Sequence, residues 1–149
     1  MIKIRSFLVM ALTAMTTLTA SAGPDADSLG HCLTDNTSGK DRKALARWMF
    51  VGISTHAEIK NLSSATPEDL DQSSKVVGVL VTKLLSESCP SEARRAIQTE
   101  GAQSMQAAFD ILGRGAMQEL MADPNVARAM SSFERHIDRK KVESALAAR

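Results

Sequence analysis

The chain has 149 residues, with 18 basic and 17 acidic side chains and a formal net charge of +1. This balance gives no strong field to attract nucleic acid or an anionic membrane. Aromatic residues make up 3% of the chain and tyrosine is absent, which argues against aromatic nucleic-acid platforms, whereas the abundant good helix formers favour an all-α protein.

The first 22 residues have the order of a secretory signal peptide. Lys3 and Arg5 precede an apolar stretch over 7–18, and Ala20-Ser21-Ala22 forms an A-x-A cleavage site. The apolar stretch is shorter than the about 20 residues that a membrane-spanning helix needs. We therefore expect cleavage after Ala22 and a periplasmic domain of residues 23–149 that has no transmembrane segment and does not bind nucleic acid.

The first part of this domain, residues 23–37, is expected to be an ordered but irregular lead-in, because it is rich in Gly, Pro, Asp, Ser and Thr. It contains Cys32, and the second cysteine is Cys89, 57 residues later. An even number of cysteines in a chain with an export signal indicates a disulfide between Cys32 and Cys89. The alternatives are a pair of metal ligands and a catalytic thiol, and the export signal favours the disulfide over both. The chain-entropy relation gives such a crosslink roughly 4 kcal/mol.

A first helix is expected from the capping box of Ser38 and Asp41 to about Lys60. Apolar residues recur in it at steps of three and four. The centre, residues 44–53, is apolar on most sides except at Arg47, which predicts a helix that is surrounded by others.

A second helix is expected to begin at Thr66, where Asp69 completes another capping box and Pro67 suits the first turn. Its expected buried stripe consists of Leu70, Val77, Leu80, Val81 and Leu84. The β-branched residues within 76–81 raise a strand alternative, which we reject because the run has neither a partner strand nor a turn signal.

A third helix is predicted over 91–122, with a kink or a close helix crossing at Gly113 and Gly115. Asp123-Pro124 then begins a last helix. Its stripe consists of Val126, Met130, Phe133 and Ile137, and residues 138–149 are expected to fray. The predicted architecture is an all-α, single-domain bundle of four or five helices, whose disulfide ties the lead-in to the turn between the second and third helices.

The densest polar stretch is residues 35–43, which we call the polar corner. Its Gly-Lys pair lacks the spacing of a P-loop. The favoured interpretation is a helix cap with solvated charges, and the alternative is a corner at which Asp35, Lys40, Asp41 and Arg42 bind a partner. Trp48, further along the same helix, is expected in the core, with an interface anchor as the alternative.

No catalytic constellation, metal site or cofactor site stands out. The three histidines lack the spacing of metal ligands, and His56 is expected on the apolar stripe as a partly buried, hydrogen-bonded side chain. Met105, Met117 and Met121 are expected to fill the core, in preference to a copper site of thioethers. The sequence therefore predicts a protein that is not an enzyme and carries no cofactor.

Three segments, Cys32-Leu33-Thr34-Asp35, Ser38-Gly39-Lys40-Asp41-Arg42 and Leu45-Ala46-Arg47-Trp48, resemble a pattern found in small exported bacterial proteins. In its layout of signal peptide, about 130 mature residues, helices and a disulfide, the chain is similar to small helical periplasmic immunity proteins. That resemblance implies a protein partner, a toxin that a competing bacterium delivers through a secretion system.

The functional expectation is therefore a non-enzymatic periplasmic binding protein, most concretely an immunity protein that neutralises a secreted toxin by occluding it. Its expected anchors are Asp35, Lys40, Asp41, Arg42 and Trp48. The alternative is an envelope-stress or assembly helper that binds unfolded or apolar surfaces, which predicts exposed apolar area on the folded protein.

Overall fold

The computed structural model describes residues 23–147, and all regular elements in that range are helical. The seven α-helices are α1 (Pro24–Asp35), α2 (Gly39–Ile53), α3 (Pro67–Lys83), α4 (Pro90–Glu100), α5 (Gln103–Met121), α6 (Pro124–Ser131) and α7 (Arg139–Ala147). Shorter helical turns are η1 (Lys60–Leu62), η2 (Leu84–Ser88) and η3 (Ser132–His136). The all-α class is confirmed, but the predicted number of four or five helices is wrong. The predicted signal peptide lies outside the described residues.

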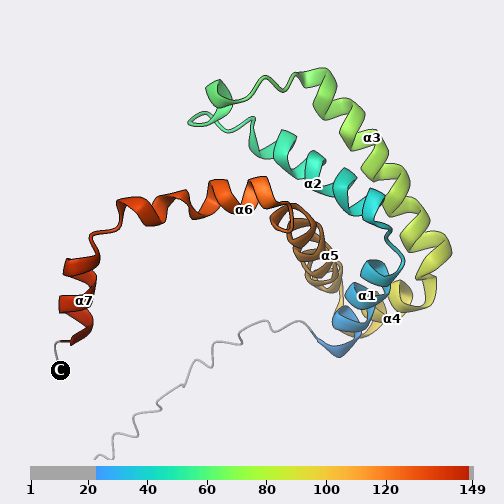
Figure 1. The fold of residues 1–149 in the computed structure, drawn as a ribbon. Coiled ribbons are helices and arrows are strands. Elements are labelled where there is room, and N and C mark those ends of the chain that lie inside the picture. Colours follow the sequence, from blue (N-terminus) through green and yellow to red (C-terminus); the bar gives the residue numbers. More distant parts are fainter. Residues whose placement is uncertain (1–22, 148–149) are drawn as a thin grey trace, which may run out of the picture.

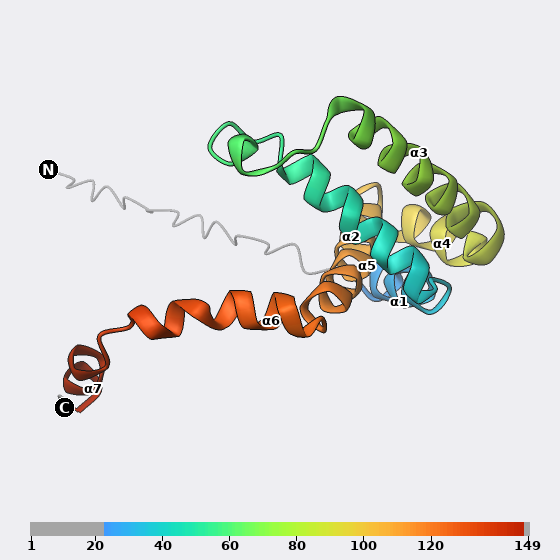
Figure 2. The same cartoon turned by 45° about the horizontal axis from the view of Figure 1, so that its top comes forward.

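The first five helices form a bundle in which α1 and α2 both pack on α5, while α3 packs on α2 and α4 packs on α1 (Figures 1 and 2). Their shared core is almost wholly aliphatic. Its largest completely buried side chains are Leu29, Leu33, Leu84 and Leu112. Large aromatic side chains are absent from this list, so close packing of leucine and alanine holds the bundle together.

The predicted irregular lead-in is wrong, because residues 24–35 form α1 and its inward face is buried. The buried residues Ala26, Leu29, Gly30 and Leu33 follow helical spacing. The N-terminus of α1 is capped from a distance: the backbone N–H groups of Asp25 and Ala26 donate to the carboxylate of Glu100, at 2.9 and 3.0 Å. Because the capping residue is 75 positions away, the sequence around the start of α1 does not indicate this cap.

The first predicted helix ends earlier than expected, at Ile53 and not near Lys60. The hydroxyls of Ser54 and Thr55 donate to the carbonyls of Val51 and Gly52 at 2.8 Å, and the backbone tightens into short turns there. Serine and threonine compete in this way with the helical hydrogen bonds.

The start of α3 agrees with its predicted capping box at Thr66, and residues 76–81 are helical as predicted. The predicted helix over 91–122 is instead two helices that meet at Gly101, whose φ of +77° is a conformation open to glycine but costly for other residues. Helix α5 continues through both Gly113 and Gly115, and of the two predicted alternatives the close helix crossing fits Gly115, where an added methyl group would lie 3.7 Å from Thr34 of α1.

The predicted disulfide is confirmed: Cys32 in α1 is bonded to Cys89, which precedes α4. Cys89 is fully buried, and the crosslink ties α1 to the junction of η2 and α4. The amide of Asn36 donates to the carbonyl of Cys32 at 2.9 Å and closes the end of α1 beside it. The disulfide therefore fixes the end of α1 that leads into the polar corner.

Residues 124–147, which we call the C-terminal arm, lead away from the bundle (Figures 1 and 2). Asp123 caps α6 as predicted, since its carboxylate accepts from the N–H groups of Asn125 and Val126. The predicted buried stripe is wrong, because none of the residues of α6, η3 and α7 is buried. Residues Arg139–Ala147 form α7, so the fraying expected over 138–149 is not found in that range.

Candidate functional site

An apolar groove lies on the bundle between α2, α3 and α5, and we call it the central groove. Its volume is about 460 Å³. The residues that line it are Leu45, Trp48, Ser74, Val77, Gly78, Val81, Phe109, Leu112 and Gly113. All of these are apolar except Ser74, so the groove offers an occupant hydrophobic burial with little hydrogen bonding.

Trp48 forms one wall of the central groove and is 37% exposed, so the expectation of a core tryptophan is wrong. Its indole N–H donates to the hydroxyl of Ser74 at 3.2 Å, which joins α2 to α3 across the groove. This hydrogen bond satisfies the indole nitrogen, and the apolar part of the ring stays available for contact with an occupant of the groove. Trp48 thus meets the description of an interface anchor, an aromatic side chain held in place before a partner arrives.

Two glycines keep the central groove open. A methyl group added at Gly78 or at Gly113 would meet no other atom within 4 Å. Both residues lie inside helices, where glycine costs about 1 kcal/mol relative to alanine. At both positions the backbone leaves room for a β-carbon, and a side chain there would project into the groove.

The polar corner divides into residues that bind within the chain and residues that face solvent. Arg42 donates to the carbonyl of Thr37 at 2.9 Å and pairs with Glu119 of α5 at 3.2 Å. Asp41 completes the capping box of α2 with Ser38, as predicted. Asp35 and Lys40 are exposed and make none of the hydrogen bonds or ion pairs found among the described residues.

The capping box also sets the electrostatics of the corner. Hydrogen bonds from the hydroxyl and the backbone N–H of Ser38 hold the pKa of the Asp41 carboxyl below its ordinary value of 3.8. Asp41 is therefore charged near neutral pH, and its negative charge stabilises the N-terminus of α2. Along α2, Trp48 lies seven residues or about 10 Å from Asp41, and Asp35 ends α1, so the predicted anchors do not form one pocket.

The remaining candidates do not assemble into a catalytic or metal-binding site. His31, His56 and His136 are all exposed, which corrects the expected partial burial of His56. Met117 and Met121 are each 42% exposed and so do not fill the core, whereas Met105 packs against it. Among residues 23–147 there is no group of three His, Cys, Asp or Glu side chains that could hold a metal ion, and none of the helices could span a bilayer.

Comparison of the chain with protein-family models, with curated proteins and with solved structures gave no match.

Sequence reasoning identified Trp48 but missed the groove that it borders. The other lining residues come from α3 and α5, and only the fold brings them to α2. Gly78 and Gly113 were the residues that could have indicated the groove in the sequence. Glycine destabilises a helix interior, so its presence there usually has a packing or functional reason.

Proposed function

We propose that this chain is a non-enzymatic periplasmic protein that binds an apolar helical segment of other envelope proteins, as an assembly or stress helper does. The observation that carries the proposal is the central groove, an apolar trough bordered by an ordered tryptophan and kept open by two helical glycines. A groove between helices that has apolar walls is a recurring receptor for one face of an amphipathic helix.

The exposed apolar side chains elsewhere on the molecule support the same role. Phe50 and Ile53 at the end of α2 are 59% and 58% exposed, and Leu62 in η1 is 85% exposed. Exposed apolar area of this kind suits a protein that contacts unfolded or apolar surfaces. The helper hypothesis predicts exposed apolar area on the folded protein, and these side chains support it.

The decisive variant is Gly78→Leu, which places an apolar side chain in the groove at a position where an added β-carbon meets no other atom within 4 Å. We expect it to be as stable as the parent or more stable, by up to about 1 kcal/mol, because glycine is replaced inside a helix. At the same time it should weaken binding of a tryptophan-free amphipathic peptide, with Leu at i, i+3, i+4 and i+7, at least about tenfold. Trp48 is the chain's one tryptophan, so its fluorescence reports the groove directly in a titration.

Gly52→Leu is the matched control. Gly52 also lies inside a helix with no atom within 4 Å of an added methyl group, but it does not line the central groove. This variant should bind the peptide as the parent does. If neither parent nor control binds the peptide, or if Gly78→Leu binds it with unchanged affinity, the groove is not the binding site.

The second candidate function is the immunity protein, which inhibits one toxin by covering it. The observation in its favour is the polar corner, where Asp35 and Lys40 are exposed on a segment that the disulfide and the Arg42–Glu119 pair hold in place. A rigid surface of this kind suits a single partner, since little conformational entropy is lost on binding.

Charge reversal separates the two functions. For an immunity protein, Lys40→Glu should weaken capture of the cognate toxin from envelope extracts of competing strains at least about tenfold and leave thermal stability unchanged. Lys60→Glu, a reversal at an exposed lysine outside the corner, is the control. If capture survives Lys40→Glu and is lost in Gly78→Leu, the corner is excluded as the anchor.

A further inference from the structure

The C-terminal arm carries an apolar strip that no other part of the described chain covers. Its exposed large apolar side chains, each at least 42% exposed, are Met130, Phe133, Ile137, Val142 and Leu146. Among the described residues, α6 packs only against α5 and the turn that follows, and α7 packs against no other element. The strip is therefore open to a surface outside the chain.

Both helices of the arm are specified by local caps although they are short. The carboxylate of Asp123 caps α6, and that of Asp138 accepts from the backbone N–H of Lys141 at 3.1 Å at the start of α7. The helices have eight and nine residues, fewer than the about 12–15 residues that an isolated helix needs to be stable in water. A surface that buries their apolar side would stabilise both.

The near-neutral charge of the whole chain conceals an uneven distribution. Residues 23–123 contain fourteen acidic and ten basic side chains, a formal charge of −4. Residues 124–147 contain three acidic and five basic side chains, a formal charge of +2. The five basic side chains of the arm take part in none of the ion pairs found among residues 23–147. An anionic surface therefore attracts the arm and repels the rest of the described chain.

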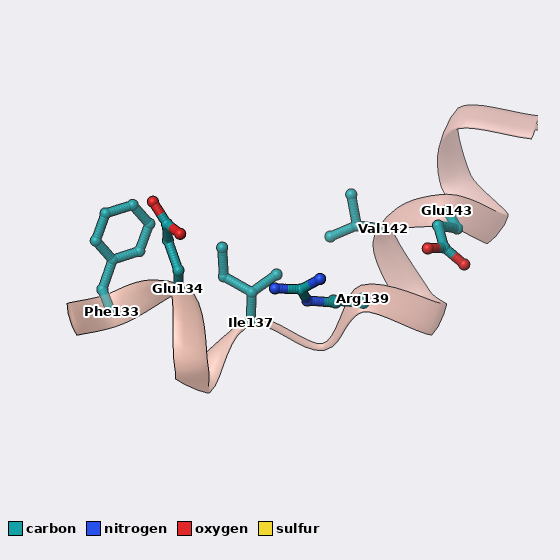
Figure 3. Close-up of a pocket in the computed structure, with 6 residues that line it drawn as sticks. All are labelled: Phe133, Glu134, Ile137, Arg139, Val142 and Glu143. Atoms are coloured by element: carbon teal, nitrogen blue, oxygen red, sulfur yellow. The ribbon is translucent and has the colours of Figure 1, made fainter. Parts of the chain in front are cut away.

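Figure 3 shows the bend of the arm between η3 and α7, where a hollow of about 440 Å³ lies. Phe133 and Ile137 project to the same side of the ribbon there, and Arg139 extends from α7 toward Ile137. An arginine beside apolar side chains can lay its stem along them and keep its guanidinium in a polar layer. That arrangement suits the boundary between acyl chains and headgroups in a bilayer.

Two carboxylates limit the attraction of the arm to anions. Glu134 and Glu143 also line the hollow, and they belong to no ion pair of the described chain. An excess of two positive charges gives an attraction that salt screens readily. The apolar strip must therefore supply the rest of the affinity, and binding should need both components.

We propose that the arm docks on the surface of an anionic lipid bilayer, with its apolar strip at the acyl boundary and its basic side chains among the lipid phosphates. A one-sided apolar strip combined with an excess of basic residues is typical of helices that lie in a membrane interface. The arm leads away from the bundle, so it can reach lipid without bringing the acidic bundle close (Figures 1 and 2).

This inference goes beyond the proposed function and does not depend on the central groove. The groove lies between α2, α3 and α5, and the arm begins after α5. One chain can therefore hold an apolar segment in its groove while its arm rests on lipid. Docking of the arm would keep the groove at the membrane surface, where apolar segments of envelope proteins are inserted.

Vesicle flotation of the protein purified after export tests the apolar component. We expect the parent to float with vesicles of phosphatidylglycerol and phosphatidylcholine in equal parts, and to be released by high salt. Phe133→Asp should lower the partition coefficient at least about tenfold. Leu62→Asp, which places the same charge at an exposed apolar residue outside the arm, should float as the parent does. Because Phe133 is exposed, circular dichroism of the variant should match that of the parent.

The electrostatic component is tested by Lys140→Glu/Lys141→Glu. This variant should also lose at least about tenfold in partition onto the anionic vesicles. Lys60→Glu/Lys83→Glu changes the net charge equally at two exposed lysines of the bundle, so it should retain most of the binding of the parent. Equal flotation of the parent with pure phosphatidylcholine vesicles would overturn the electrostatic part of the proposal.

A parent that does not float with anionic vesicles overturns the proposal, and so does a Phe133→Asp variant that floats as the parent does. If the parent does not float but captures an acidic protein that Phe133→Asp does not capture, the arm is a protein-binding surface instead. The groove is judged separately, because Phe133→Asp should bind the amphipathic peptide in the Trp48 titration as the parent does. Failure of the arm therefore leaves the proposed function standing.

Discussion

Loss of the Cys32–Cys89 disulfide is expected to lower the free energy of unfolding by roughly 4 kcal/mol. The crosslink joins residues 57 positions apart, and the chain-entropy relation assigns a loop of that length about this value. Domains of this size have a net stability of about 5–15 kcal/mol, so the loss is a large share of the total. Urea unfolding of Cys32→Ala/Cys89→Ala, followed by circular dichroism and by Trp48 fluorescence, measures it.

The reduced parent protein is the control, since it keeps both sulfur atoms and lacks only the bond between them. Cys89 is fully buried, so the double alanine variant loses some packing in addition and should be slightly less stable than the reduced parent. Equal urea midpoints for the oxidised and reduced parent would show that the crosslink adds no stability. In that case α1 is held by its packing, by the Glu100 cap and by the bonds of Asp25 to Arg95 and Thr99 of α4.

The helix starts were the part of the fold that the sequence predicted best. Ser38 and Thr66 cap their helices through reciprocal bonds with an aspartate three residues later, and Asp123 caps α6. These bonds lie within one turn of helix, so residue order alone specifies them. The disulfide was predictable for another reason, because the expected export favours oxidation and two cysteines have one intramolecular pairing available.

The errors arose where distant residues decide the outcome. Glu100 caps α1 from 75 residues away, so the lead-in looked irregular although its buried residues have helical spacing. Helix α4 ends at Gly101, whereas helix α5 continues through Gly113. Gly101 has a positive φ, and residue type alone does not show which glycine adopts that backbone conformation. The arm kept a regular apolar stripe, but periodicity shows which side chains share a face and not whether another helix covers that face.

Only part of the candidate site could be predicted from the sequence. Trp48 could be singled out as an aromatic in a helical stripe, yet its partner Ser74 and the opposite wall at Phe109 lie on other helices. Arg42 was predicted to be solvated or available to a partner, but in the fold its guanidinium forms an ion pair with Glu119 of α5. Charged residues near a helix start are visible in a sequence, whereas their tertiary partners are not.

Gly30→Ala is expected to destabilise the protein by about 1–2 kcal/mol, although it replaces glycine inside a helix. At Gly30 helix α1 approaches α5 so closely that an added methyl group would lie 2.9 Å from the β-carbon of Ile111 and closer still to the end of that side chain. Overpacking typically costs about 1–3 kcal/mol, and contacts this short belong in the upper part of that range, so about 1–2 kcal/mol remains after the gain of about 1 kcal/mol in helix propensity is subtracted. Thermal and urea unfolding measure the difference.

Gly115→Ala tests the same pair of helices without the clash. A methyl group there would lie 3.7 Å from the γ-carbon of Thr34, an ordinary contact, so this variant should be as stable as the parent or gain up to about 1 kcal/mol. Truncating Ile111 to alanine removes most of the obstruction, so Gly30→Ala should cost less in that background than in the parent. If Gly30→Ala instead behaves like Gly115→Ala, α1 does not pack against Ile111 as described. The Cys32 end of α1, and the polar corner that follows it, would then be positioned by the disulfide and not by the core.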